Sequence, residues 1–201
     1  MINPLFQVTY TCLLCEQEFQ SSRVRPSYKK PYKRDADFCL HYHETNPEYY
    51  VVRVCKYCGF ATTENFSMKI KDSQRREFML KIGNDWKGKD YGGARTWEEA
   101  LEAYKLALLC AQVKDESSRV IAGILHHIAW MYRYKEDHEM EERFLRYSLE
   151  AYETVYESGE DELNAAKLMY IMGELNRRLK NYHEAVRWFS RVVNDKKIIF
   201  Q

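Results

Sequence analysis

The sequence predicts an α+β protein, with a small metal-bound β head followed by a domain of α-helical hairpins. Two observations support this class. Two Cys-x-x-Cys pairs, each framed by strand-forming residues, lie before Phe60. After Phe60, strand formers become fewer and apolar residues recur with the period of a helix. We therefore divide the chain into a zinc-binding head, residues 1–66, and a helical repeat domain, residues 67–201.

The composition fits a globular protein and offers no membrane span. Apolar residues make up 45% of the 201 residues, charged residues make up 30%, and the net charge is +1. So small a net charge creates no overall field toward nucleic acid or an acidic membrane. No apolar run approaches the roughly 18 residues of a membrane span, and the first residues lack a signal core. We expect a cytoplasmic protein, in which paired cysteines more often bind metal than form disulfides.

The four paired cysteines predict a structural zinc site; they are Cys12, Cys15, Cys55 and Cys58. Two thiols three positions apart on a tight turn can face one ion, and a tetrahedral zinc takes four ligands. A head of this size buries little surface, and zinc supplies on the order of 10 kcal/mol. Four thiolates leave no position open to water, so we expect a structural role and no catalysis. The alternatives are a redox dithiol, although neither pair opens a helix, and plain core cysteines.

Strand-forming residues surround both turns. Residues 7–19 predict a strand, the first turn and a second strand, and residues 49–54 predict a strand that leads into Cys55. In a strand over residues 37–43, Asp37, Cys39, His41 and His43 would share one face. That face could form a second metal site or, more simply, a solvated strand edge, because such alternation is common.

A basic and aromatic stretch lies between the two turns. Its cations are Arg23, Arg25, Lys29, Lys30, Lys33 and Arg34. They could neutralise nucleic-acid phosphates while Tyr28 and Tyr32 stack on bases. The alternative is a structural loop whose cations form salt bridges to Asp35 and Asp37, which follow at once.

Helical periodicity begins after the head. It predicts helices over residues 72–82, 117–134, 140–156, 163–179 and 182–193. One more helix begins after Thr96, which forms a capping-box signal with Glu99, and residues 87–95 form a loop before it. Cys110 lies on an apolar face of that helix and is expected to be buried.

The last two helices resemble a tetratricopeptide (TPR) repeat. Gly173 would let the following helix approach near Ala185, and Phe189 would fill the space one turn later. Two weaker copies upstream bring the number of hairpins to about three, near the minimum for a stable stack.

TPR geometry would place one set of side chains on a concave face, as a partner-binding groove. The set is His126, Trp130, Arg133, Tyr134, Lys167, Tyr170, Arg177 and Arg178. An aromatic, arginine-bearing groove suits an acidic peptide or chain terminus. The alternative is that the helices fill their own groove. The apolar residues 198–200 would dock on the stack or on another chain.

One pattern extends through the head. It comprises Cys12 and Cys15, the run Arg34-Asp35-Ala36-Asp37-Phe38-Cys39, Asn46-Pro47, and Cys55-x-x-Cys58-Gly59-Phe60. In this pattern the chain resembles an uncharacterised bacterial domain-of-unknown-function family. The resemblance implies a zinc-ribbon-like head and a TPR-like helical tail over the whole chain, and it supplies no activity. Glu16 stands where such turns commonly have glycine, which predicts a looser first turn.

The sequence favours a binding role over catalysis. No nucleophile–base pair, phosphate-binding glycine loop or paired acid motif stands out. We expect a non-enzymatic, zinc-binding cytosolic adaptor that binds a protein or peptide partner through the TPR-like groove. The alternative is a zinc-ribbon nucleic-acid-binding protein that uses Arg23 to Arg34.

Overall fold

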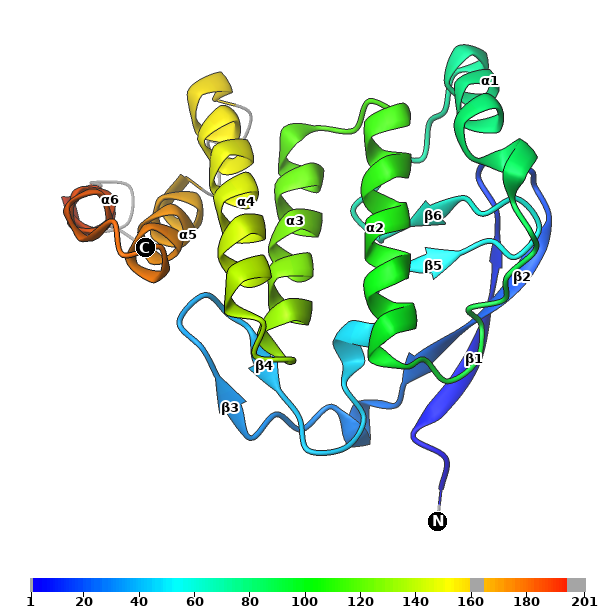
Figure 1. The fold of residues 1–201 in the computed structure, drawn as a ribbon, viewed down its shortest axis with the longest axis horizontal. Coiled ribbons are helices and arrows are strands. Elements are labelled where there is room, and N and C mark those ends of the chain that lie inside the picture. Colours follow the sequence, from blue (N-terminus) through cyan, green and yellow to red (C-terminus); the bar gives the residue numbers. More distant parts are fainter. Residues whose placement is uncertain (1, 160–164, 195–201) are drawn as a thin grey trace. The chain divides into compact units, whose positions relative to one another are not determined.

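The computed structural model describes residues 2–159 and 165–194 of the chain, with short strand pairs first and helices after them (Figure 1). Contacts divide the chain into two compact units. The first comprises Met1–Arg34 and Leu40–Val120, and the second comprises Asp35–Cys39 and Ile121–Gln201. The boundary predicted between residues 66 and 67 falls inside the first unit, and the division into a zinc-binding head and a helical repeat domain stays a prediction. The predicted apolar end, residues 198–200, lies outside the described residues.

The first unit contains three antiparallel strand pairs. β1 (Leu5–Thr11) pairs with β2 (Glu18–Val24), β3 (Lys33–Arg34) with β4 (Leu40–His41), and β5 (Arg53–Val54) with β6 (Ala61–Thr62). The turns that follow β1 and β5 contain the two cysteine pairs, as predicted. Two short 3-10 helices, η1 (Pro26–Tyr28) and η2 (Pro47–Tyr50), connect the strand pairs.

Two predicted strands are wrong in extent. Residues 47–50 form η2, so that only Arg53–Val54 remains of the strand predicted over residues 49–54. The cause is local, because Pro47 favours the first turn of a helix and the Asn46 side chain accepts a hydrogen bond from the Glu48 N–H. The strand predicted over residues 37–43 is reduced to β4, because Phe38 has a left-handed backbone (φ 69°) that ends the alternation.

The first unit also contains helices. They are α1 (Asp72–Lys81), η3 (Gly83–Asp85) and α2 (Trp97–Val113). Of these, α2 packs on strands and α1 packs on α2. The predicted capping box is present, since the Thr96 hydroxyl accepts from the Glu99 N–H and the Glu99 carboxylate accepts from the Thr96 N–H. α2 lies against β5 and β6 and buries Cys110, whose sulfur accepts a hydrogen bond from the Ala61 N–H at 3.3 Å.

The second unit is built from helices. They are α3 (Ser118–Arg133), of which the first three residues count with the first unit, α4 (His138–Ser158), α5 (Ala165–Arg178) and α6 (Tyr182–Asn194). Their core is a cluster of Ala129, Leu145, Leu149, Val155, Leu168, Ile171, Met172, Leu175 and Leu179. None of the described helices combines the length and the apolar character that a membrane crossing requires.

The predicted close approach at Gly173 is confirmed. A Cβ at Gly173 would lie 2.7 Å from Cε1 of Phe189, nearer than carbon atoms approach each other. Only glycine therefore lets α6 pack on α5 in this way. Ala185 is buried in the same hairpin.

Candidate metal centre and helical groove

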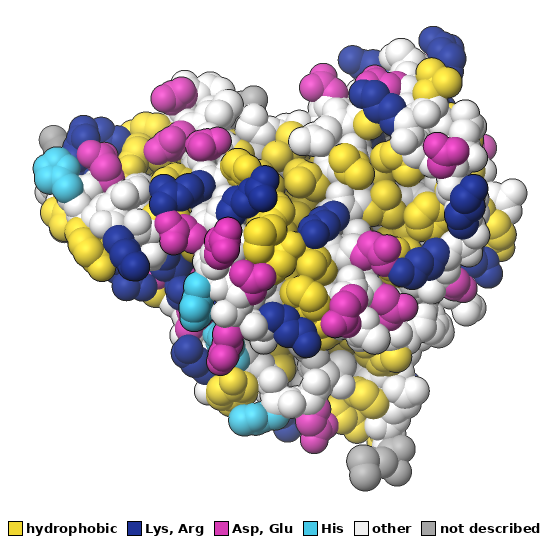
Figure 2. Space-filling model, in the orientation of Figure 1, with side chains coloured by type: hydrophobic (Ala, Val, Ile, Leu, Met, Phe, Trp, Pro, Cys, Tyr) yellow, Lys and Arg dark blue, Asp and Glu magenta, His cyan; other side chains and the backbone are white. Residues whose placement is uncertain are grey.

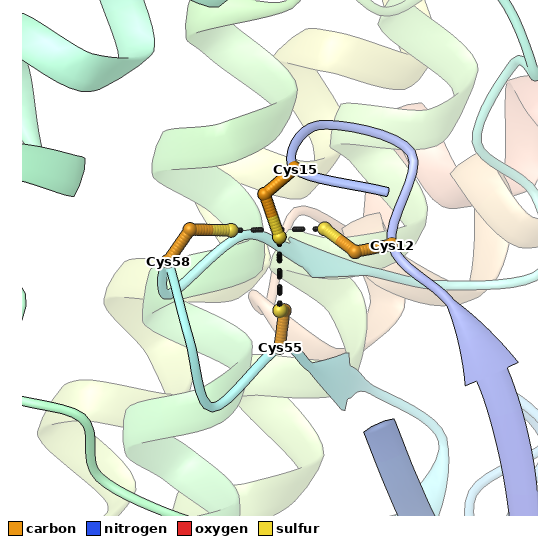
Figure 3. Close-up of side chains that lie close together, drawn as sticks. All are labelled: Cys12, Cys15, Cys55 and Cys58. Carbon is orange, nitrogen blue, oxygen red and sulfur yellow. Dashed lines mark hydrogen bonds between the residues drawn. The ribbon is translucent and has the colours of Figure 1, made fainter. Parts of the chain in front are cut away.

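The four predicted cysteines converge on one point in the first unit. Sγ of Cys12 lies 3.6 Å from Sγ of Cys58, and Sγ of Cys15 lies 3.6 Å from Sγ of Cys55. All four sulfurs lie within 4.8 Å of one another and face a common centre (Figure 3). Four thiolates around a tetrahedral zinc, at about 2.3 Å each, would be separated by about 3.8 Å. The cluster is therefore a possible metal site, and its donor spacing fits tetrahedral coordination.

The two turns have the same backbone construction. The Glu16 N–H donates to the Cys12 carbonyl at 3.0 Å, and the Gly59 N–H donates to the Cys55 carbonyl at 2.8 Å. Glu16 and Gly59 both have left-handed backbones, with φ of 63° and 77°. The looser first turn predicted from Glu16 is thus wrong, because glutamate adopts the conformation that glycine adopts in the second turn. Each turn consequently directs both of its sulfurs toward the same centre.

Burial and proximity make the thiols electrostatically interdependent. Hydrogen bonds from Cys12 and Cys58 lower the pKa of Cys55 to about 2, because they stabilise its thiolate. Donating to Cys55 in turn raises the pKa of Cys12 to about 12. The pKa of Cys58 is also raised, first by its hydrogen bond with Cys12. A bound cation would replace these shared protons, so metal binding releases protons.

A second cluster lies in the second unit, where the turn Asp35–Cys39 meets the helices. Asp37 is fully buried. Its Oδ1 accepts from Nη1 of Arg133 at 2.9 Å, and its Oδ2 accepts from Nη2 of Arg133 at 2.7 Å. Oδ2 also accepts from Nε1 of Trp130 at 3.2 Å and lies 3.3 Å from Nε2 of His126. Arg178 adds an ion pair, with Nε at 3.3 Å from Oδ2.

Further contacts hold the same turn along its length. The Asp35 carboxylate contacts Arg133 at 3.0 Å and Arg178 at 3.3 Å. The Tyr170 hydroxyl donates to the carbonyl of Ala36 at 3.0 Å, and the Tyr170 ring packs on Phe38. Two more contacts reach the turn: Lys167 Nζ lies 5.9 Å from the Phe38 ring centre, and Cys39 Sγ lies 3.5 Å from the Tyr134 hydroxyl. Arg133 is itself held by Glu141, to which its Nε donates at 2.7 Å.

These contacts fix the protonation states in the cluster. Burial alone would raise the pKa of Asp37, but hydrogen bonds from His126 and Arg133 and the charge of Arg133 hold it well below its usual range. Burial lowers the pKa of His126, so His126 is neutral and donates its Nε2 proton to Asp37. Burial raises the pKa of Cys39 to about 12. Cys39 is therefore a thiol at neutral pH.

The predicted partner-binding residues thus contact a segment of their own chain. Of the eight, seven lie against the turn Asp35–Cys39: His126, Trp130, Arg133, Tyr134, Lys167, Tyr170 and Arg178. Arg177 instead pairs with Glu174 at 2.7 Å, and its side chain is 49% exposed. Sequence reasoning matched Asp37 with the basic stretch before it. The missed signal was that the predicted groove was basic and the nearby run Asp35–Asp37 was acidic.

The other predicted site residues lie in residues 37–43 and in the basic stretch. The strand predicted to place Asp37, Cys39, His41 and His43 on one face is interrupted at Phe38, and His43 stacks on Tyr32 at 4.1 Å. In the basic stretch, Arg25 donates to the Asn3 carbonyl and lies over Phe6, Lys33 and Arg34 form β3, and Lys30 is exposed. Arg23 and Lys29 line a cavity. Across the face drawn in Figure 2, basic and acidic side chains are interspersed, as the small net charge suggests.

Fold and site together define an α+β protein with a four-cysteine candidate metal centre in its strand-rich part. The chain belongs to the family described as uncharacterized protein conserved in bacteria (DUF2225), whose model matches residues 5–199. The resemblance found in the sequence is thereby confirmed over nearly the whole chain. No curated protein and no solved structure matches.

Proposed function

We propose that the protein is a zinc-stabilised, non-enzymatic adaptor of the cytoplasm. Zinc is the metal that fits best, because four thiolates in a tetrahedral arrangement are a typical structural zinc donor set. The ligands would be Cys12, Cys15, Cys55 and Cys58, three of them buried. A full sulfur shell leaves no position for water or substrate, so zinc would supply folding energy to the short strand pairs.

The partner surface would lie on the helical unit. The supporting observation is that this unit already binds an acidic turn through Arg133, Arg178, Trp130 and His126, which is the chemistry of a peptide groove. A turn supplied by the same chain has a high effective concentration, so a partner would not displace buried Asp37. It would bind the exposed rim instead, where Lys167 and Arg177 add positive charge.

A capture experiment with matched variants tests this proposal. Tagged protein is incubated with lysate of the bacterium that encodes it, with and without nuclease. Arg177→Glu is compared with Arg146→Glu, because both arginines are exposed and pair with a glutamate on their own helix. We expect a protein partner that survives nuclease, is lost with Arg177→Glu and is kept with Arg146→Glu. Equal binding by both variants would contradict the proposed surface.

The structure changes which variants are informative. Arg133 has only 9% of its side chain exposed and holds Asp35, Asp37 and Glu141 together. Replacing Arg133 would therefore alter the fold, and loss of a partner would be uninterpretable. Arg177 avoids this difficulty because its only carboxylate contact among the described residues is Glu174.

Nucleic-acid binding through the stretch Arg23 to Arg34 is the second candidate function. It is favoured by one observation, that Arg23 and Lys29 line a cavity together with aromatic side chains. In the experiment above, loss of every captured partner after nuclease treatment would favour this candidate over the adaptor.

A further inference from the structure

A cavity of about 280 Å³ lies in the first unit, away from the four cysteines. Its principal lining residues are Tyr10, Arg23, Lys29, Tyr42, Tyr50 and Arg53. Tyr10, Arg23, Tyr50 and Arg53 lie in β1, β2, η2 and β5, respectively. Lys29 directly follows η1, and Tyr42 directly follows β4. Elements distributed over the whole strand-rich part therefore meet at this point.

The strand register explains why cations and aromatic rings share the cavity. Arg23 lies opposite Phe6 in the β1–β2 pair. Tyr10 follows Phe6 by four positions, so Arg23 and Tyr10 project from the same face of the pair. The guanidinium of Arg53 lies 4.7 Å from the centre of the Tyr10 ring, which positions it at this face.

The cations of the cavity are not neutralised by ion pairs with the described part of the chain. Within residues 2–159 and 165–194, no carboxylate forms an ion pair with Arg23, Lys29 or Arg53. Glu48 and Glu64 also line the cavity and offset part of this charge, but three cations in one concave site still repel one another, and a bound anion would relieve that repulsion. This distinguishes them from Arg133 and Arg178, whose charges are neutralised by Asp35, Asp37 and Glu141.

The other lining groups define what the anion would be attached to. Tyr10, Tyr42 and Tyr50 offer flat apolar surface for a base, and the carboxylates of Glu48 and Glu64 can accept hydrogen bonds from sugar hydroxyls or amino groups. The volume is at the lower end of ligand-binding pockets, which suits one nucleotide and not a long ligand. We propose that this cavity binds a single phosphorylated nucleoside, either free or as one residue of single-stranded RNA.

This site is independent of the proposed protein partner. It refines the second candidate function, nucleic-acid binding, because it replaces the whole stretch Arg23 to Arg34 with one cavity as the binding site. Of the six cations predicted to bind nucleic acid, only Arg23 and Lys29 belong to it, and Arg53 joins them from outside the stretch.

The test is direct binding to the purified, zinc-loaded full chain at low salt. The probes are AMP, UMP, inorganic phosphate and a fluorescent twelve-nucleotide single-stranded RNA. Lys29→Gln is compared with Lys30→Gln, since the two lysines are adjacent and exposed and only Lys29 lines the cavity. Arg53→Gln is a second variant, with zinc content and melting temperature measured to confirm folding.

We expect AMP or UMP to bind more tightly than phosphate, and binding to weaken about tenfold with Lys29→Gln and Arg53→Gln but less than twofold with Lys30→Gln. Binding of RNA without binding of free nucleotides, with the same variant pattern, would support the site and identify RNA as the source. Equal loss with Lys29→Gln and Lys30→Gln would overturn the cavity while leaving the nucleic-acid function standing. No binding of any probe at millimolar concentration would overturn both.

Discussion

Arg133 donates two hydrogen bonds of 2.9 and 2.7 Å to the two carboxylate oxygens of Asp37, although the two residues are 96 positions apart in the chain. This pair joins the turn Asp35–Cys39 to α3, and Arg178 brings α5 to the same carboxylate. Since Asp37 is fully buried, the pair is protected from water and salt. This cluster, together with the four cysteines, determines most of what the structure lets us predict.

Removing the charge of Asp37 should destabilise the protein strongly. Asp37→Asn would leave Arg133 and Arg178 with Asp35 and Glu141 but without their fully buried counter-charge, a loss of about 3–5 kcal/mol in the free energy of unfolding. Asp35→Asn removes one contact with each arginine and should cost less. Urea denaturation followed by circular dichroism measures both. Equal, small losses would show that the bidentate pair contributes little.

Acidification should weaken the fold through His126. Its folded-state pKa is lowered, so the unfolded chain binds a proton below about pH 6.5 that the folded chain refuses. Stability therefore falls as pH drops from 7 to 5.5, by about 1 kcal/mol from this residue. Below about pH 4 the lowered pKa of Asp37 causes a further loss, because its stabilisation exists only above its unfolded pKa.

His126→Gln provides the control for this pH dependence. Glutamine can donate a hydrogen bond to Asp37 but does not titrate, so the loss between pH 7 and 5.5 should shrink in the variant. The free energy of unfolding at the two pH values, measured with zinc in excess, gives the comparison. If the free energy of unfolding fell equally with pH in the variant and in the natural chain, His126 would not be the cause of the acid sensitivity.

Alanine should destabilise the protein at Gly59 but have almost no effect at Glu16, the equivalent position of the first cysteine turn. A Cβ at Gly59 would lie 2.5 Å from the Trp86 ring and would occupy a left-handed backbone, so Gly59→Ala should cost about 1–3 kcal/mol. Glu16 already has a Cβ in the same conformation, so Glu16→Ala should change stability by less than about 0.5 kcal/mol. Melting temperatures of the zinc-loaded variants distinguish them, and a tolerated Gly59→Ala would contradict the geometry of the second turn.

Two glycines within helices should respond to alanine with opposite signs. Gly173→Ala places a Cβ 2.7 Å from Phe189 and should destabilise by about 1–3 kcal/mol. At Gly123 in α3 a Cβ would meet no described atom within 4 Å, so Gly123→Ala should stabilise by up to about 1 kcal/mol through helix propensity. Thermal denaturation of each variant shows whether its melting temperature falls or rises. A stabilising Gly173→Ala would show that α6 does not pack on α5 as closely as described.

The sequence was sufficient where the signal is local or chemically specific. The two cysteine pairs and the Thr96–Glu99 capping box follow from spacing, and the close approach at Gly173 follows from the resemblance of the last two helices to a TPR repeat. It failed where one local preference overrode another, as when Asn46-Pro47 began a 3-10 helix inside a run of strand formers. It failed also for the partner of Asp37, because no local pattern reveals which of many arginines a distant aspartate will bind.

The metal content of the purified protein tests the central claim most directly. Elemental analysis of the natural chain should give one zinc ion per chain, Cys55→Ser should lose it, and Cys110→Ala, which alters a buried cysteine outside the cluster, should keep it. Absence of zinc from the natural chain would contradict the four-cysteine site. Retention of zinc by a double variant with Cys55→Ser and Cys58→Ser would contradict it as well.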